Sequence, residues 1–118
     1  MAKLTVVLLA DAETHEQMGR GANAFELVKD AKQKDLDVEL ILDGAGTRWV
    51  RELSKPEHKL HGLFEEVRDR VTGVCEFCAG AFGVREAVRA SGLPFAGEFE
   101  GHPSLARRVA EGRQVVTF

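Results

Sequence analysis

The sequence has no excess of positive charge, and this argues against binding to nucleic acid. Its 118 residues include 16 lysines and arginines against 19 aspartates and glutamates, for a net charge of −3. Proteins that hold a phosphate backbone usually show a basic patch and a high isoelectric point. We therefore expect no nucleic acid among the partners of this protein.

Long apolar runs are also missing. The longest, from Leu4 to Ala10, is preceded by a single lysine and is far shorter than the roughly 20 residues that a membrane helix needs. We predict neither a signal peptide nor a membrane partner, and we expect a cytoplasmic location.

Cysteine is scarce, and the two cysteines, Cys75 and Cys78, lie three positions apart. A chain of this length buries about 60% to 70% of its unfolded surface and needs no disulfide or metal to hold a core. Without an export signal, such thiols are more often catalytic or metal-bound than structural, and they indicate a reducing compartment. The pair is therefore the first candidate for chemistry.

Strand and helix patterns alternate along the whole chain. Residues 4–10 are β-branched and almost continuously apolar, which is typical of a strand buried on both faces, and we predict that they form the central strand. Further strands are expected at 38–42, 71–75, 93–96 and 114–118. Helical spacing predicts helices over 24–34, 49–53, 60–67, 84–91 and 103–110, the last with Pro103 in its first turn.

This alternation predicts right-handed crossovers and hence one α/β domain, residues 1–118, with a mostly parallel sheet of about five strands covered on both faces. In such folds, ligands bind at the rim where strand carboxyl ends meet helix amino ends. The predicted order of elements places five side chains on this rim: Asp11, Asp43, Cys75, Cys78 and His102.

The Cys75-Glu76-Phe77-Cys78 motif lies where the third predicted strand passes into a turn and a helix. Helix-terminal N–H groups can lower the pKa of a thiol there and make it nucleophilic, and two thiols at this spacing can exchange as attacking and resolving partners. The alternative is a pair of small buried side chains, because cysteine is among the most buried residue types. We favour a functional pair, since both cysteines coincide with a strand end.

His102 could place an imidazole on the same rim and serve as a base for the thiols. An equally good interpretation is that it merely precedes Pro103 at the start of a helix. The sequence predicts solvated surface for nearby Glu98, because nothing pairs it into an acid/base couple.

A zinc site would require more ligands, and His58 and His61 precede the cysteine pair. Histidine pairs in zinc sites are usually separated by three to five residues, whereas two residues separate these. We therefore expect no metal and no cofactor, with both histidines at ordinary surface or half-buried positions.

Residues 19–24, with the sequence GRGANA, match a Gly-x-Gly-x-x-Ala dinucleotide fingerprint. In a true fingerprint the first glycine directly follows a strand, but here residues 11–18 intervene. A flexible loop that enters a helix is the better interpretation, and a nucleotide-binding domain remains an alternative function.

Taken with these motifs, the sequence resembles the DsrE-like family of sulfur-relay proteins, which includes the DsrE, DsrF and TusD subunits. In that family a cysteine precedes a small-residue run and a Gly-Val or Gly-Ile by eight positions, a spacing that Cys75 and Gly83 reproduce. The resemblance covers nearly the whole chain: the first strand and residues 42–44, 75–84 and 101–105.

The resemblance implies a flavodoxin-like three-layer sandwich and a homo-oligomer, either a trimer or a hexamer. It also implies that Cys75 corresponds to the family's persulfide-carrying cysteine and that sulfur donor and acceptor proteins are partners. Our leading hypothesis is a cytosolic thiol protein that carries or transfers sulfane sulfur on Cys75, with Cys78 releasing it by forming a disulfide. The alternative is a non-enzymatic binding or assembly protein of the same fold.

Trp49 and Phe99 are our candidate contacts between subunits. Each is flanked by charged residues, Arg48 and Arg51 in the first case and Glu98 and Glu100 in the second. An apolar anchor within a polar rim is typical of protein interfaces. The alternative is that each side chain caps the core of its own subunit.

Overall fold

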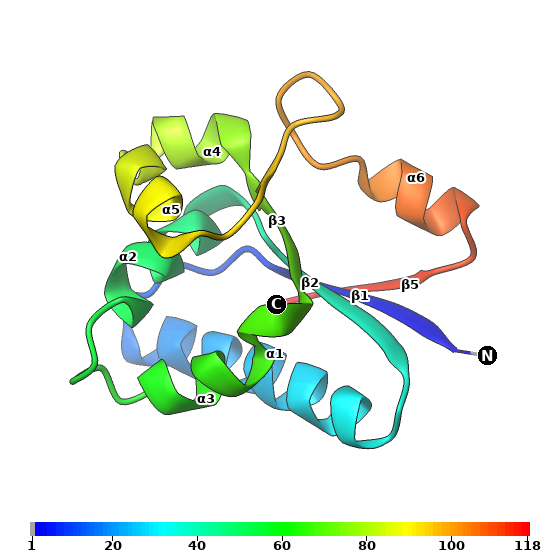
Figure 1. Ribbon diagram of the computed structural model, residues 1–118, viewed down its shortest axis with the longest axis horizontal. Helices are drawn as coiled ribbons and strands as arrows, with labels where there is room; N and C mark the ends of the chain where they lie inside the picture. The colour runs from blue at the N-terminus through cyan, green and yellow to red at the C-terminus, as the bar shows by residue number, and fades with distance from the viewer. Residues whose placement is uncertain (1) are drawn as a thin grey trace.

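A five-stranded, all-parallel sheet forms the centre of the computed structural model, which describes residues 2–118 (Figure 1). The α/β class and the parallel sheet are confirmed, but the expectation that the first strand is central is wrong. The order is β4-β3-β2-β1-β5, with β2 central, because three crossovers step in one direction from β1 and only β5 lies on its other side. The strands are β1 (Lys3–Leu8), β2 (Asp37–Leu42), β3 (Val71–Cys75), β4 (Phe95–Ala96) and β5 (Gln114–Thr117).

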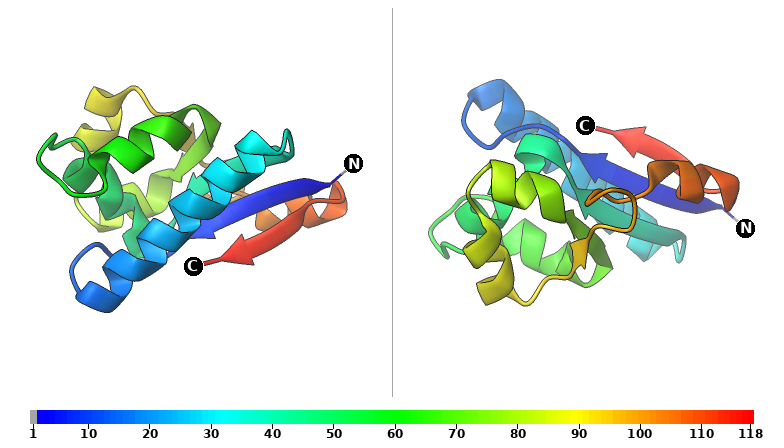
Figure 2. Two further views of the ribbon diagram at one scale, coloured as in Figure 1. Left: turned by 90° about the horizontal axis from the view of Figure 1, so that it is seen from below. Right: turned by 90° about the horizontal axis from the view of Figure 1, so that it is seen from above.

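Helices cover both faces of this sheet. The views of Figures 1 and 2 agree that α1 and α3 lie on one face and α6 on the other. Within residues 2–118, no helix combines the length and the apolar character that a membrane crossing requires. The helices are α1 (His15–Gln33), α2 (Trp49–Leu53), α3 (His61–Val67), α4 (Glu76–Ala81), α5 (Arg85–Ser91) and α6 (Leu105–Ala110), with 3₁₀ turns η1 (Gly44–Arg48) and η2 (Arg68–Arg70).

Helix α1 begins well before the predicted residue 24 because Thr14 caps it. The Thr14 side chain accepts from the Gln17 N–H, and the Gln17 side chain accepts from the Thr14 N–H, which together satisfy two helix-end donors. Residues 19–24 are therefore helical rather than a loop, and a Cβ on Gly21 would lie 2.4 Å from the Trp49 ring. Gly21 serves helix packing, and the interpretation of residues 19–24 as a dinucleotide fingerprint is wrong because that motif needs a strand-to-helix turn.

Helix α6 starts later than predicted. Ser104 is its N-cap and accepts from the Arg107 N–H at 3.2 Å, so Pro103 lies before the cap and outside the first turn. The hydroxyl of Ser104 can satisfy a helix-end N–H, which proline cannot do. This start leaves residues 97–104 as a loop between β4 and α6.

Trp49 belongs to the core between the sheet and the helices. Its side chain is fully buried, its Nε1–H donates to the Ala10 carbonyl at 2.9 Å, and its ring packs edge-on against Phe25 at 5.6 Å. Trp49 is therefore not available as a subunit contact, and that expectation is wrong. Phe99 is 60% exposed and remains a candidate.

Candidate functional site

The two cysteines lie at the junction between β3 and α4. Cys75 ends β3 and caps α4, its side chain is fully buried, and its Sγ accepts from the Cys78 N–H at 3.4 Å. Cys78 lies in the first turn of α4 and is half-buried, and both thiols are free. Residues three positions apart on a helix share a face, so the motif spacing brings the thiols together.

The loop after β4 carries His102 to the same place. Phe99 and His102 exchange backbone hydrogen bonds of 2.8 and 2.9 Å, and the two residues between them, Glu100 and Gly101, have φ values of 53° and 85°. A two-residue turn with positive φ at both positions is a tight hairpin of the I′ kind, and Gly101 adopts it without strain. The turn places His102 Nδ1 3.3 Å from Cys75 Sγ.

Phe77 of α4 holds this turn in place. Its N–H donates to the Gly101 carbonyl at 2.9 Å, and its ring lies 4.9 Å from the His102 ring. The Gly101 carbonyl also lies 3.8 Å from Cys75 Sγ and accepts its weak S–H bond. The turn consequently covers the Cys75 sulfur.

Asp43 completes the cluster from the carboxyl end of β2. It caps η1 by accepting from the Gly44 N–H at 2.8 Å, and its Oδ1 lies 3.5 Å from Cys78 Sγ. The ligand-forming atoms of Asp43, Cys75, Cys78 and His102 all lie within 4.8 Å of one another. They converge because β2, β3 and β4 are neighbours in a parallel sheet and end on one rim.

Burial raises the pKa of the Cys75 thiol. The Cys78 N–H lowers this pKa, but the Cys78 side chain and the Asp43 carboxylate raise it further. The expectation that helix N–H groups give a low pKa here is therefore wrong for Cys75, because desolvation outweighs one weak N–H···S bond. A thiolate in this cluster needs a compensating positive charge.

Glu98 ties the His102 loop to α6. Its Oε2 accepts from the Ser104 N–H at 2.8 Å and from Arg108 Nη1 at 2.6 Å. Burial raises the pKa of Glu98, but these hydrogen bonds and the charge of Arg108 outweigh it and bring the pKa to about 2. The sequence predicts solvated surface here, whereas the structure makes Glu98 an anchor of the loop.

Arg108 continues this connection into the sheet. It is 6% exposed, and its Nε donates to Glu39 Oε2 of β2 at 3.2 Å. Glu39 also accepts from Thr5 at 2.6 Å and Thr72 at 2.5 Å. Burial raises the pKa of Glu39, but these hydrogen bonds outweigh it and lower the pKa.

Sequence reasoning missed this network, although one signal was present. Glu39 interrupts the apolar strand 38–42, and a charge buried in a strand requires a partner. Nothing in the sequence spacing identifies Arg108 as that partner, because the contact depends on where α6 packs on the sheet.

Three predicted candidates lie outside the cluster. Asp11 pairs with Arg48 Nη1 at 2.6 Å. The His58 ring packs against Trp49 at 6.0 Å, and His61 Nδ1 lies 2.6 Å from the Leu53 carbonyl. The two histidines considered as zinc ligands therefore do not approach the cysteines.

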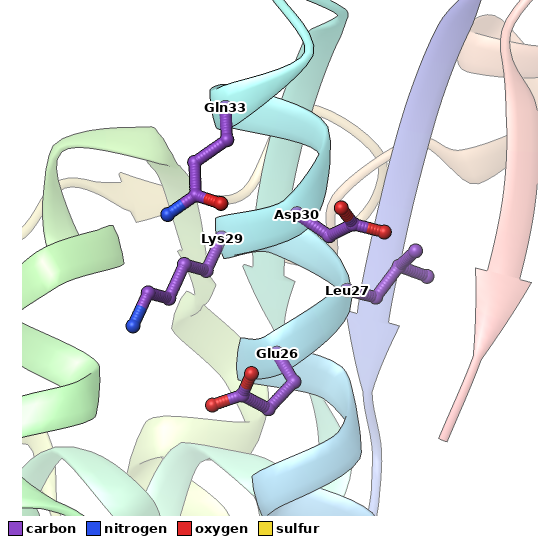
Figure 3. Close-up of a pocket in the computed structure, with 5 residues that line it drawn as sticks. All are labelled: Glu26, Leu27, Lys29, Asp30 and Gln33. Atoms are coloured by element: carbon purple, nitrogen blue, oxygen red, sulfur yellow. The ribbon is translucent and has the colours of Figure 1, made fainter.

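A hollow on the surface of α1 offers no competing site. Figure 3 shows that its lining side chains all project from one helix. Lys29, one of them, is already paired with Glu66 of α3 at 3.3 Å, and no thiol or imidazole is present. The lining residues are Glu26, Leu27, Lys29, Asp30 and Gln33.

Comparisons with known proteins agree with this fold. The model of the DsrE/DsrF-like family matches residues 5–118, and the chain belongs to that family. The uncharacterized protein MJ0733 of Methanocaldococcus jannaschii is 33% identical over 85 residues, which cover 72% of this chain and 69% of that protein.

A solved structure shares the fold. The conserved protein of unknown function BT1422 from Bacteroides thetaiotaomicron superposes with a TM-score of 0.65, covering 97% of this chain and 94% of the other. At 15% sequence identity, this likeness concerns the architecture alone.

The Glu98 anchor predicts a specific pH dependence of stability. A carboxyl whose pKa is depressed in the folded state stabilises above its unfolded pKa and loses that contribution as the pH falls through its folded pKa. Glu98→Gln should lower the free energy of unfolding by about 1 kcal/mol at neutral pH, the size of a partly screened charged hydrogen bond. The difference from wild type should shrink between pH 4.5 and about 2.

Denaturant unfolding at a series of pH values measures this difference. Glu100→Gln removes the same charge from an exposed position on the same loop and should have little effect at any pH. A Glu98→Gln deficit that stayed constant down to pH 2 would contradict the role of the Glu98 charge.

Proposed function

We propose that the protein carries sulfane sulfur as a persulfide on Cys75, with Cys78 as its release partner. One observation carries this proposal: the Cys75 sulfur lies between His102 Nδ1 at 3.3 Å and the Cys78 N–H at 3.4 Å, with a second thiol one turn away. Membership of the DsrE/DsrF-like family supports it.

Loading begins with transfer of the Cys75 proton to His102, which acts as the base. The Cys75 thiolate attacks the outer sulfur of a donor persulfide, a new S–S bond forms, the donor S–S bond breaks, and the donor leaves as a thiolate that takes up a proton. The donor must reach a sulfur that Gly101 and His102 cover, so loading requires the 99–102 turn to move aside.

The outer sulfur of the Cys75 persulfide can leave by two routes. An acceptor thiolate can attack the outer sulfur, which transfers the sulfur and regenerates the Cys75 thiol. Alternatively, the Cys78 thiolate attacks the inner sulfur, so that a Cys75–Cys78 disulfide forms and sulfide leaves. This second route oxidises both thiols, and a reducing thiol must restore them.

Exposed aromatic side chains beside the cluster support docking of partners or of further copies of the chain. Phe77 is 57% exposed and Phe99 is 60% exposed. We propose that the chain assembles as a trimer or hexamer with Phe99 at a contact, and that donor and acceptor proteins dock near Phe77. A binding or assembly role without sulfur chemistry would use the same surfaces, and the sulfur-loading experiment separates the two functions.

Mass spectrometry after exposure to a sulfane-sulfur donor tests the carrier function. Wild type and Cys78→Ser should gain the mass of one sulfur atom, with Cys78→Ser releasing sulfide more slowly. Cys75→Ser should not load. His102→Gln should load about 100-fold more slowly, a loss typical of a general base.

His58→Ala is the matched histidine control, because His58 lies away from the cysteines, and it should load like wild type. A folded Cys75→Ser protein that gained one sulfur as readily as wild type would contradict the assignment of Cys75 as the sulfur-carrying residue.

Sedimentation at micromolar concentration tests the assembly. We expect a trimer or hexamer, and Phe99→Asp should weaken it because a desolvated charge at a contact is costly. Val109→Asp is the matched control at a position 61% exposed on α6. A wild-type species of one chain's mass, 12.9 kDa, would exclude a stable oligomer.

A further inference from the structure

Four side chains from three neighbouring strand ends form a group with the composition of a metal site. Asp43 follows β2, Cys75 and Cys78 lie at the end of β3, and His102 follows β4. From this juxtaposition we propose that Asp43, Cys75, Cys78 and His102 bind one Zn²⁺ ion. The site stands whether or not the protein carries sulfur, and goes beyond that function.

The distances fit a tetrahedral ion. With Zn–S bonds of about 2.3 Å and Zn–N or Zn–O bonds of about 2.0–2.2 Å, sulfur lies roughly 3.5 Å from a neighbouring nitrogen or oxygen ligand. The Cys75 Sγ to His102 Nδ1 distance is 3.3 Å, and the Cys78 Sγ to Asp43 Oδ1 distance is 3.5 Å. All other pairs lie within 4.8 Å, so small side-chain rotations close the coordination shell.

The chemistry of the set favours zinc over hard cations. Two sulfur ligands, an imidazole and a carboxylate suit a borderline-soft ion, whereas Mg²⁺ and Ca²⁺ prefer oxygen ligands only. Binding releases the two thiol protons to solvent and uses His102 in its neutral form through Nδ1. The ion also supplies the positive charge that two thiolates and a carboxylate at such short range require.

Backbone donors already hold two of the ligands. The Cys78 N–H points at Cys75 Sγ, where it would stabilise the negative charge of a metal-bound thiolate. The Gly44 N–H holds Asp43 Oδ1 at 2.8 Å. Such outer contacts orient ligands and are a regular part of metal sites.

Although the sequence places Asp43 and His102 on the same rim as the thiols, it predicts no metal, because the zinc partners considered for the cysteines are His58 and His61 and their spacing is too short. The fold replaces both of them: Asp43 and His102 arrive from segments far away in the chain. Across residues 2–118, this is the single group of at least three potential ligands close enough to share an ion.

Four protein ligands leave no open coordination position, so the ion would act on structure and access rather than as a catalyst. It would link the ends of β2, β3 and β4 and withhold both sulfurs from a donor persulfide. The metal-bound and sulfur-loaded states are then mutually exclusive.

Zinc binding to the reduced, chelator-treated full chain tests the proposal directly. Titration with Zn²⁺ against a chromophoric chelator, followed by dialysis and elemental analysis, should give one zinc per chain. Co²⁺ should produce thiolate-to-metal charge transfer and the visible bands of a tetrahedral ion. Asp43→Asn and His102→Ala should each weaken zinc binding by more than about 10-fold, the smallest loss expected even for an outer partner.

Matched controls separate these ligands from the other candidates. Asp11→Asn and His58→Ala should bind zinc like wild type. Cys75→Ser should weaken zinc binding. If this variant fails to fold, Cys78→Ser, which replaces the half-buried thiol, should weaken both zinc binding and the cobalt charge-transfer band.

Zinc retention no greater in wild type than in Cys78→Ser, or loss of zinc in His58→Ala with His102→Ala unaffected, would overturn the site. Sulfur loading of the metal-free protein is measured in parallel, so a failure of zinc binding leaves the carrier function standing, and the reverse also holds.

Discussion

The Arg108 guanidinium connects the parts of the molecule on which the site depends. It binds Glu39 in the sheet and Glu98 in the loop that carries His102. Both contacts lie beneath α6, where Arg108 is almost fully buried. Glu39 also pairs with Arg113 at 3.2 Å and Glu98 with Arg107 at 3.4 Å, so Arg108 is the shared member of a larger charge network. The position of His102 over Cys75 therefore rests on a charge network whose centre lies on a different helix.

The cluster of Asp43, Cys75, Cys78 and His102 shields the Cys75 sulfur from solvent but also holds the groups that could activate it. A fully buried Cys75 under the 99–102 turn is shielded from solvent, and its raised pKa keeps the resting thiol protonated. Reactivity must come from a positive charge or from a base, and His102 is the nearest group able to supply either. Sulfur carriage and zinc binding are two proposed uses of the same four side chains. In sulfur carriage the Cys75 proton moves to His102, and in zinc binding the thiol protons are released to solvent.

Most of the strands could be predicted from local pattern because they are largely apolar runs, although Glu39 interrupts β2 and β4 is shorter than predicted. The position of Cys75 at the site could also be predicted from the sequence, since the cysteine motif coincides with a strand end. The role of Trp49 could not be predicted from the sequence, because charged residues flank a buried side chain on a short helix just as they flank an exposed interface residue. Only the contacts made in the fold, with the ring against Phe25 and the indole N–H on the Ala10 carbonyl, distinguish the two.

The shared rim could be predicted, but the contacts on it could not. The alternation of strands and helices places Asp43, Cys75 and His102 at one rim of the sheet, whereas their close approach depends on the strand order, in which β2, β3 and β4 are neighbours. The turn that aims His102 depends on positive φ at Glu100, a residue type with no special preference for that conformation.

Thiol alkylation of the metal-free protein measures whether the Asp43 charge acts on the buried Cys75 sulfur. Rates at Cys75 and Cys78 would be resolved by peptide mass in wild type, Asp43→Asn and, as a matched control, Asp11→Asn. Asp43 raises the pKa of the Cys75 thiol, so removal of its charge should make the Cys75 thiolate easier to form and speed alkylation at Cys75, while Asp11→Asn should not. Equal alkylation rates at Cys75 in all three proteins would show that the Asp43 charge does not act on this thiol.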